Sequence, residues 1–166
     1  MSSKFKILGN KIIHNGFFKM KEITLKYQKY DGKWSNEIKR ELFGGAQVSA
    51  VLPYDPDNKK IVLIQQFRPG TISKKGNNYL DEIVAGIIDK GETPEETAIR
   101  ECFEETGCEA KNLRPILGYF PAPGSSESFY HLFLGEVVAP NKEIIKGLEN
   151  ENCLLYTSPS PRDVEE

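Results

Sequence analysis

The stretch of chain between positions 86 and 107 decides the fold, and it reads Gly86-Ile-Ile-Asp-Lys-Gly-Glu-Thr-Pro-Glu-Glu-Thr-Ala-Ile-Arg-Glu-Cys-Phe-Glu-Glu-Thr-Gly107. Its second part carries the signals of a helix. Thr93 is a preferred N-cap residue, Pro94 suits the first helical position, and Glu96 completes a capping box. Gly107 supplies the glycine that commonly follows the last helical residue. We therefore predict a loop followed by a helix over residues 94–106.

Three glutamates of this helix, Glu101, Glu104 and Glu105, stand at positions i, i+3 and i+4, so their carboxylates share one face. Like charges at these spacings destabilise a helix by roughly 0.2–0.5 kcal/mol per pair. A divalent cation would remove this repulsion, and carboxylate oxygens are ligands that Mg²⁺ and Mn²⁺ accept. Taken alone, a Glu-x-x-Glu-Glu pattern is more often a solvated acidic face than a metal site.

The buried side of the helix is predicted from residues that recur at helical spacing, namely Ala98, Ile99, Cys102, Phe103 and Thr106. This stripe would leave the three glutamates on a neighbouring face at the edge of the core. Partial access of water at such an edge suits a hard cation that keeps some of its own water.

The surroundings of the glutamates favour the metal site, because the pattern resembles the signature of the Nudix hydrolase family. That signature is Gly, five residues, Glu, seven residues, then Arg-Glu-apolar-x-Glu-Glu-x-Gly-apolar. Its fixed positions are filled here by Gly86, Glu92, Arg100, Glu101, Glu104, Glu105 and Gly107. Cys102 and Cys108 take the two apolar positions, which small, weakly hydrophobic thiols can fill.

The resemblance implies a loop–helix–loop that holds metal ions against a diphosphate. The metal ligands that it implies are the backbone carbonyl of Ala85 and the carboxylates of Glu101, Glu104 and Glu105. Arg100 and Glu92 are expected to form an ion pair that fixes the loop to the helix, which is a structural role. Arginine offers no ligand to a metal, whereas its rigid fork suits a carboxylate.

Composition bounds the function. A chain of 166 residues can form one domain with a real core, and its net charge of −2 gives no electrostatic footprint for nucleic acid. No apolar run approaches the length of a membrane span, and the Lys-containing N-terminus does not read as a signal peptide. The three cysteines lack paired metal spacing and are expected to be reduced thiols. We expect a cytoplasmic protein without nucleic-acid or membrane partners.

Strands are predicted on both sides of the central helix. They cover residues 23–30, 34–43, 47–53, 61–67, 80–85, 115–120 and 129–138, with Asp31-Gly32 as the turn of an N-terminal hairpin. This order predicts an α+β or α/β sandwich, and the resemblance implies an α+β fold of the Nudix type, an α/β/α sandwich. We expect a mixed β-sheet with a catalytic loop–helix–loop, preceded by a small N-terminal antiparallel β segment.

We divide the chain into an N-terminal β segment over residues 1–45, which would serve dimerisation and the adenine side, and a Nudix hydrolase domain over residues 46–152. In the family the last loop continues into a strand and a long helix. Here it is followed by Cys153-Leu-Leu-Tyr-Thr-Ser-Pro-Ser-Pro-Arg-Asp163, which reads like one frame of a transposase sequencing adapter. We therefore expect a truncated domain with a non-native tail over residues 153–166. The alternative is a genuine Ser/Pro tail that is disordered by composition.

The loop Pro121-Ala-Pro-Gly-Ser-Ser-Glu-Ser128 indicates the substrate class. Within the Nudix family, a proline at this distance beyond the signature, followed by a Gly/Ser-rich turn with Glu, resembles the ADP-ribose pyrophosphatases. Pro123 fits that proline, and Ser126 and Glu127 fit contacts to the terminal sugar. Without the upstream signature, Pro-Gly-Ser-Ser would simply be a turn.

The same resemblance assigns further substrate-binding residues. Phe17, in Gly16-Phe17-Phe18, matches the place where an aromatic ring stacks on adenine, a contact worth about 1–3 kcal/mol. Ordinary core packing of Phe17 and Phe18 is an equally good interpretation. Arg40 and Arg68 match positions that approach the base or the diphosphate, where arginine supplies paired hydrogen bonds. Glu82 falls at a substrate- or metal-side position, or else forms a salt bridge at a strand edge.

The chemistry predicted from the resemblance is metal-assisted hydrolysis of the ADP-ribose diphosphate to AMP and ribose 5-phosphate. The catalytic residues would be Glu104, Glu105 and a base, Glu151, in the loop 147–152. A solvated loop carboxylate is the alternative for Glu151. His14 and His131 stand in strand-like surroundings without a nearby acidic partner in the sequence, so neither is the preferred base.

Two other functions stay open at this point. One is hydrolysis of another nucleotide sugar or dinucleotide, such as GDP-mannose or NADH. The other is an inactive, truncated nucleotide-binding fragment. The resemblance also suggests a homodimer whose N-terminal segments exchange across the interface. The expected partner of the site is a small nucleotide sugar, the substrate.

Overall fold

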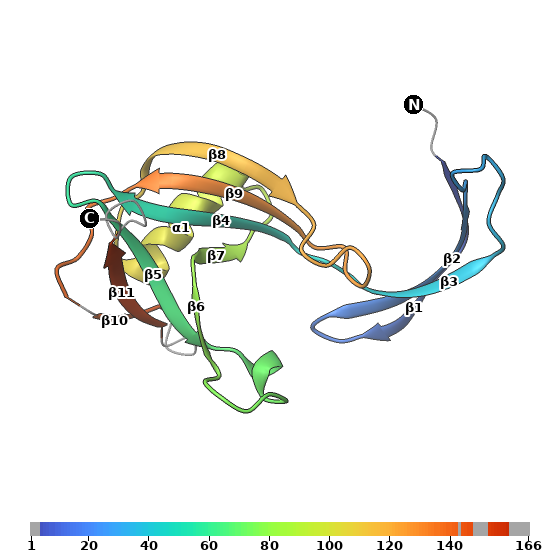
Figure 1. Ribbon diagram of the computed structural model, residues 1–166, viewed down its shortest axis with the longest axis horizontal. Helices are drawn as coiled ribbons and strands as arrows, with labels where there is room; N and C mark the ends of the chain where they lie inside the picture. The colour runs from blue at the N-terminus through green and yellow to red at the C-terminus, as the bar shows by residue number, and fades with distance from the viewer. Residues whose placement is uncertain (1–3, 143, 148–152, 160–166) are drawn as a thin grey trace. The chain divides into compact units, whose positions relative to one another are not determined.

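The computed structural model describes residues 4–142, 144–147 and 153–159 (Figure 1). The chain divides into two compact units. The first contains the residues up to Ala46 together with Phe120–Phe129, and the second contains Gln47–Tyr119 and the chain from Tyr130 onward. Each unit is described by itself.

The first unit is a three-stranded antiparallel sheet in the order β1 (Phe5–Asn15), β2 (Lys19–Tyr27) and β3 (Ile38–Phe43). The register places most of the apolar side chains on one face, where Leu25 of β2 lies between Ile7 and Ile38. The same face also carries Arg40 and Asn10 on either side of Ile23. The other face is polar, and it carries the pairs Lys11 with Glu22, Thr24 with Lys39, and Lys6 with Lys26. The sheet is therefore amphipathic.

The predicted hairpin around Asp31-Gly32 is present, since β2 and β3 pair and Gly32 has a left-handed φ of 79°. The predicted bounds were inexact, because β2 begins at Lys19 and the regular pairing of β3 begins only at Ile38. Strand β1 was not predicted. Its register shifts at Ile7/Gly9 and Ile12/His14, and such bulges break the alternation by which a strand is recognised.

The sheet of the second unit runs in the order β10 (Ile144–Lys146), β11 (Cys153–Pro159), β5 (Lys60–Phe67), β4 (Gln47–Asp55), β9 (Phe129–Glu136) and β8 (Lys111–Tyr119). Strand β6 (Tyr79–Glu82) pairs with β5, and β7 (Val84–Ile87) pairs with β4. The predicted single strand over residues 80–85 is thus two short strands that serve different neighbours.

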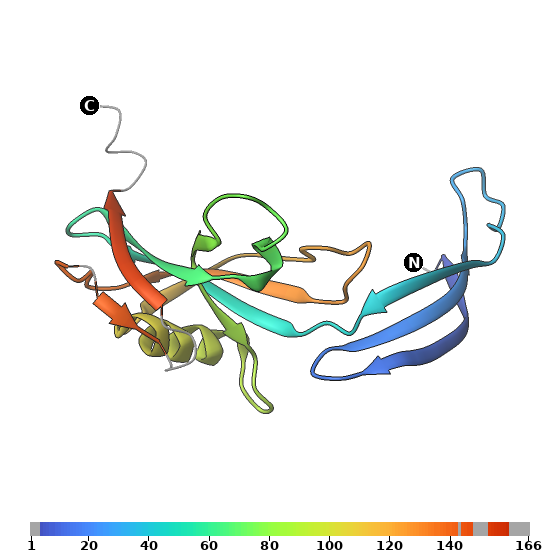
Figure 2. The same cartoon turned by 90° about the horizontal axis from the view of Figure 1, so that it is seen from below.

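The sheet is mixed, as predicted. Phe129 N donates to Ala46 O at one end of β4, and Val137 N donates to Tyr54 O at the other, so β9 runs parallel to β4. Strand β5 is antiparallel to β4, β6 and β11, and the pairs β4–β7, β8–β9 and β10–β11 are antiparallel as well. The helix α1 (Pro94–Thr106) covers one face of this sheet, and a 3₁₀ turn, η1 (Pro69–Thr71), follows β5 (Figures 1 and 2). The α+β class is confirmed.

The core lies between α1 and the sheet. Its fully buried members include Val51, Val62, Ile64, Val84, Ala98, Cys102 and Leu155. Leu155 belongs to β11, which pairs with β5, so the described residues of the C-terminal stretch, Cys153–Pro159, form a strand. The hypothesis that residues 153–166 are non-native stays a prediction. In the described part of the chain, no helix has the length and hydropathy needed to cross a membrane.

The predicted buried stripe of α1 was partly wrong. Ala98, Cys102 and Thr106 are buried, but Ile99 and Phe103 are 43% and 57% exposed. The face that packs on the sheet instead includes the polar residues Thr97 and Glu105. Both have partners, since Thr97 Oγ1 donates to Glu92 and Glu105 accepts from Ala85 N. A hydrophobicity pattern does not detect such satisfied polar groups.

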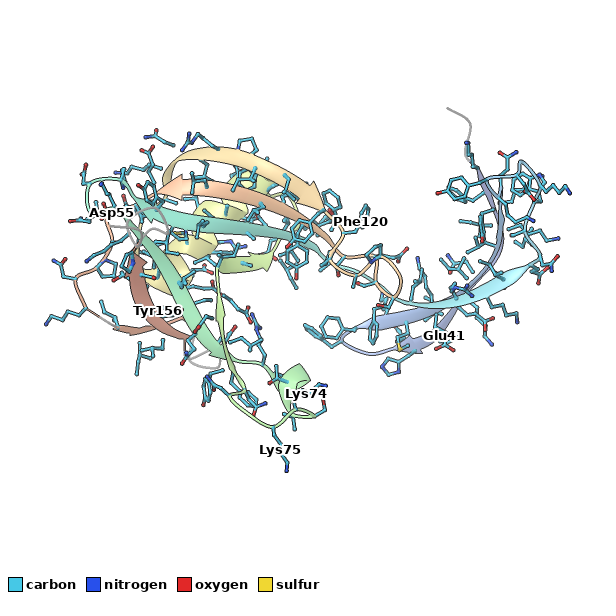
Figure 3. The ribbon with its side chains drawn as sticks, in the orientation of Figure 1. Glu41, Asp55, Lys74, Lys75, Phe120 and Tyr156 are labelled. Atoms are coloured by element: carbon cyan, nitrogen blue, oxygen red, sulfur yellow. The ribbon has the colours of Figure 1, made fainter. Side chains whose placement is uncertain are left out.

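A buried carboxylate, Asp55, ends β4 and closes the turn to β5 (Figure 3). It accepts hydrogen bonds from Asp57 N at 3.0 Å, Asn58 N at 2.9 Å, Asn58 Nδ2 at 2.9 Å and Ala139 N at 2.8 Å. The last bond ties the turn to the segment that follows β9. These bonds, led by those from Asn58, lower the pKa of Asp55 from 3.8 to about 2.

Replacing Asp55 with Asn should lower the free energy of unfolding at pH 7 by about 2 kcal/mol, because the new amide cannot accept the same set of bonds. Because the pKa of Asp55 is lowered on folding, its contribution is present above pH 3.8 and is lost as the pH falls towards 2. Urea unfolding followed by circular dichroism at several pH values measures both effects. The exposed neighbour provides the control, Asp57→Asn, and equal losses in the two variants would contradict this account.

Candidate functional site

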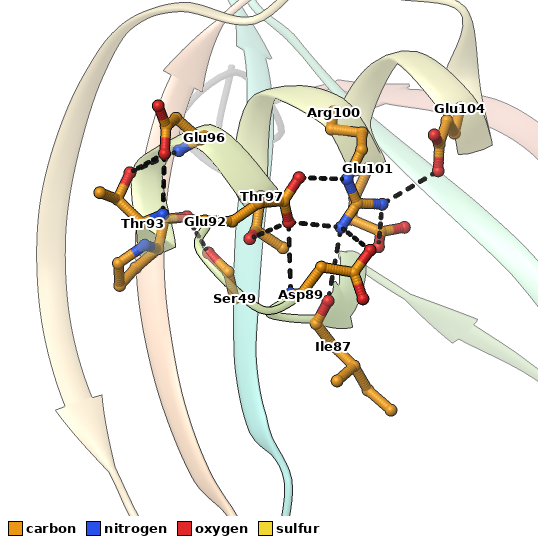
Figure 4. A network of polar contacts seen from close by, with 11 residues as sticks. Ser49, Ile87, Asp89, Glu92, Thr93, Glu96, Thr97, Arg100, Glu101 and Glu104 are labelled. Atoms are coloured by element: carbon orange, nitrogen blue, oxygen red, sulfur yellow. Dashed lines mark hydrogen bonds and ion pairs between the residues drawn. The ribbon is translucent and has the colours of Figure 1, made fainter.

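The helix α1 is held at both ends by the residues that predicted it, and Figure 4 shows the contacts at its start. Thr93 Oγ1 accepts from Glu96 N at 3.2 Å, and Glu96 Oε2 accepts from Thr93 N at 2.8 Å, which is a capping box. Gly107 has a φ of 73° and its N–H donates to Phe103 O at 2.7 Å. Ser49 Oγ of β4 donates to Pro94 O at 2.6 Å, so the start of the helix is also fixed to the sheet.

Arg100 joins the loop to the helix. Its Nε lies 2.8 Å from Glu92 Oε1 and its Nη2 lies 2.9 Å from Glu92 Oε2, a paired contact that only the arginine fork provides. Nη2 also donates to Ile87 O at 3.4 Å. The Arg100 guanidinium, with the Thr97 hydroxyl, lowers the pKa of Glu92 to about 2. The expected ion pair is therefore formed, and it stays ionised well into the acid range.

The same guanidinium contacts two of the predicted metal ligands. Arg100 Nη1 lies 2.7 Å from Glu101 Oε1 and 3.1 Å from Glu104 Oε2 (Figure 4). The side chain of Glu101 is 14% exposed, whereas that of Glu104 is 39% exposed. Glu105 is 4% exposed, and its Oε2 accepts from Ala85 N at 3.3 Å. Among the described residues these carboxylates do not already converge as a ready-made group of three metal ligands.

The donor set nevertheless fits a hard divalent cation. Glu101 and Glu105 supply carboxylate oxygens from one helix face, and Ala85 brings the backbone of β7 next to Glu105. Gly86 leaves space at the same place, because a Cβ on it would lie 1.9 Å from Glu101 Oε1. A glycine is needed here for the close approach of a carboxylate to the backbone.

Arg68, predicted to bind substrate, lies in the second unit and pairs with Glu82 of β6. Nε lies 2.9 Å from Glu82 Oε1 and Nη2 lies 2.8 Å from Glu82 Oε2. The salt bridge at a strand edge, which was one of the two interpretations of Glu82, is therefore present. A role of Arg68 towards substrate stays a prediction.

The other predicted substrate residues belong to the first unit. Phe17 is 90% exposed and stands edge-to-face with Phe18 at 4.8 Å, so it is not a core residue of this sheet. Arg40 on β3 donates from Nη1 to Lys39 O at 2.7 Å. The exposed Pro123 precedes Ser126 and Glu127 in the loop between β8 and β9.

One predicted residue lies outside the described part of the chain, and one contact in the structure was not anticipated. Glu151, the predicted base, lies outside the described residues. Lys21 forms a 2.6 Å ion pair with Glu127, and no motif pointed to it. The signal that could have found it is a lysine in the alternating series Lys21, Ile23, Leu25, where an apolar residue is expected.

Comparisons with known proteins identify the family. A family model described as the NUDIX domain matches residues 45–155, and the chain belongs to the Nudix family. The resemblance seen in the signature is confirmed, and the chain is a Nudix hydrolase.

Named relatives extend over most of the chain. An ADP-ribose pyrophosphatase of Haemophilus influenzae is 38% identical over 149 residues, covering 88% of this chain and 69% of the relative. An ADP-ribose pyrophosphatase of Escherichia coli K12 is 33% identical over 146 residues, covering 88% and 70%. A GDP-mannose pyrophosphatase of Salmonella typhimurium is 28% identical over 167 residues, covering 99% and 86%.

The fold is also found among solved structures. The crystal structure of a protein named ADP compounds hydrolase aligns with a TM-score of 0.73 and 22% identity, covering 99% of this chain and 84% of that one. At this level of identity the likeness shows the shared fold.

Replacing Gly86 with Ala should weaken binding of Mn²⁺ by on the order of tenfold or more, because the added methyl group displaces the carboxylate of Glu101. The fold should persist, since the clashing group is a side chain that can rotate. Isothermal titration calorimetry and a thermal melt measure the two properties. Gly70 is the matched control, because a Cβ there meets nothing within 4 Å. Unchanged Mn²⁺ affinity in Gly86→Ala would show that Glu101 is not a ligand.

Proposed function

We propose that this chain hydrolyses the diphosphate of ADP-ribose to AMP and ribose 5-phosphate. The observation that carries the proposal is the set of signature carboxylates at the junction of loop and helix. Glu101 lies against Gly86, and Glu105 lies against the backbone of Ala85. The relatives named ADP-ribose pyrophosphatase, 33% and 38% identical over most of the chain, support the choice of substrate.

A divalent cation, Mg²⁺ or Mn²⁺, would be held by the carbonyl of Ala85 and the carboxylates of Glu101, Glu104 and Glu105. When bound, such a cation neutralises phosphate oxygens and lowers the pKa of a coordinated water. The paired contact between Arg100 and Glu92 keeps the loop against the helix, so the ligands stay close to the backbone of β7. Glu104, the most exposed of the three, can also be reached by water.

The remaining roles follow the family resemblance. Glu151 would accept a proton from the attacking water. Phe17, which is exposed and free of the core, would stack on adenine, and Arg40 and Arg68 would approach the base or the diphosphate. Pro123, Ser126 and Glu127 would contact the terminal ribose.

Hydrolysis of GDP-mannose is the second candidate, because a GDP-mannose pyrophosphatase aligns with 99% of this chain. Its identity is lower, at 28%. The terminal sugar separates the two functions, so parallel assays with ADP-ribose and GDP-mannose at equal Mg²⁺ decide between them.

Replacing Glu105 with Gln should reduce kcat for ADP-ribose by on the order of 100-fold or more, since loss of a charged ligand removes several kcal/mol of stabilisation. The assay measures AMP release with Mg²⁺ and with a chelator, which should abolish the wild-type activity. Glu109→Gln is the control, because Glu109 is an exposed neighbour whose carboxylate pairs with Lys111. Wild-type protein that releases no AMP, or equal rates in both variants, would contradict the proposal.

We also propose that the chain forms a homodimer through the apolar face of the first sheet. That face carries Phe5, Ile7, Ile12 and Tyr27, each between 45% and 59% exposed. An apolar sheet face left open to water is typical of an interaction surface. A second copy presents the same face and can cover it symmetrically.

Replacing Ile7 with Asp should raise the dimer dissociation constant by about tenfold or more, because a charge would be buried in an apolar interface. Sedimentation equilibrium measures the constant. Lys26→Asp, on the polar face of the same sheet, should leave the assembly unchanged. A wild-type protein that sediments as a monomer would exclude the dimer.

A further inference from the structure

The loop that connects β8 to β9 is attached to the edge of the first sheet. Phe43 N donates to Ser125 O at 2.8 Å, and Glu127 N donates to Phe43 O at 3.1 Å. Phe43 and Ser126 thereby form a parallel bridge. The loop extends the sheet beyond β3 for a short distance, so its backbone is ordered by the N-terminal segment.

The connection after β3 leaves room for this attachment only because residue 45 is glycine. A Cβ on Gly45 would lie 1.9 Å from Ser128 N and 2.1 Å from Glu127 C. These are backbone atoms, so the loop itself would have to move. Phe129 N donates to Ala46 O at 3.1 Å on the other side of this contact. The backbone of residues 127–129 is therefore held against the connection that follows β3.

The side chain of Glu127 is held as well. Lys21 Nζ lies 2.6 Å from Glu127 Oε2, and the lysine side chain is only 22% exposed. In the register Lys21 pairs with Ile12 on one side and Leu42 on the other, on the apolar face of the sheet. An ammonium group at such a place needs a partner for its charge, and Glu127 supplies it.

A second lysine of the same sheet, Lys39, forms a longer ion pair in which the lysine is more exposed. Lys39 lies on the polar face, its side chain is 65% exposed, and its Nζ is 3.5 Å from Glu22 Oε1. An ion pair of that kind contributes little to stability or to shape. The contact between Lys21 and Glu127 is shorter and its lysine is less exposed, while the Glu127 side chain is 41% exposed. It ties down one oxygen of a solvent-accessible carboxylate in the loop that the proposed function assigns to the terminal sugar.

We propose that Lys21 is a positioning residue for the terminal sugar of the substrate, acting through Glu127. The inference rests on the proposed function, because it assumes that Glu127 accepts hydrogen bonds from sugar hydroxyls. Within the described part of the chain, Lys21 is the partner of this carboxylate, and the contact uses Oε2. The Glu127 side chain is 41% exposed, so a sugar hydroxyl can reach its other oxygen, Oε1. A carboxylate held in place before binding loses less conformational entropy when the sugar arrives.

The test is a double-mutant cycle with Lys21→Met and Glu127→Gln. Lys21→Met should raise KM for ADP-ribose by on the order of tenfold with kcat changed less than about twofold, since the effect is on sugar binding and not on the reacting phosphates. The double variant should show the same KM as Glu127→Gln alone, because Lys21 acts only through that carboxylate. Lys21→Arg should restore most of the affinity, and Lys39→Met should resemble the wild type.

Amide hydrogen exchange at Glu127 gives a readout that does not need activity. In Lys21→Met this amide should exchange several times faster than in the wild type, because the loop is less well held, while Lys39→Met leaves it unchanged. Additive effects on KM, or exchange and KM equal to the wild type, would overturn the inference. If the wild type releases no AMP from ADP-ribose, the proposed function fails, and the exchange result still decides whether Lys21 orders the loop.

Discussion

The paired contact between Arg100 and Glu92 is the interaction on which the site depends. It joins a turn-rich loop to the middle of α1, and it adds to the backbone bonds from Ile88 N to Gln47 O and from Glu92 N to Asp89 O that also hold the loop. Thr97 donates a further hydrogen bond to Glu92, so the carboxylate is bound on both sides by groups from the helix. The lowered pKa of Glu92 records how strongly these donors favour its charged form. The geometry of the candidate site begins with a structural ion pair.

The features that the sequence predicted well are those that depend on near neighbours. Thr93, Pro94, Glu96 and Gly107 act within a few residues, and they gave the bounds of α1 correctly. The buried face of α1 failed because packing decides it. Thr97 and Glu105 are polar, yet they are buried next to the partners that satisfy them, and the apolar Ile99 and Phe103 lie outside. Strand β1 was missed for a related reason, since its bulges exist only in relation to β2.

In the candidate site, too, the features that depend on near neighbours in the sequence were predicted and those that depend on distant contacts were not. The signature carboxylates could be found from spacing along one helix, which is a local property. The attachment of Glu127 to β3 and to Lys21 joins residues about a hundred positions apart, and no periodicity encodes that pairing. It depends on the register of β2 against β1 and β3, which is settled only when the sheet forms. Lys21 could be noticed in the sequence as out of place, but its partner could not be named.

Electrostatics explains how one guanidinium can organise the loop and still leave negative charge that a cation would balance. Glu92, Glu101 and Glu104 all contact Arg100, and Glu105 lies on the same helix. One positive charge cannot balance four carboxylates, so the junction of loop and helix around Arg100 keeps an excess of negative charge. Arginine cannot release its proton at any ordinary pH, and its contacts with Glu101 and Glu104 keep those side chains near one another. The structure thus keeps its acidic residues together by a cation of its own while leaving an excess of negative charge, and that excess is what a divalent metal ion would bind.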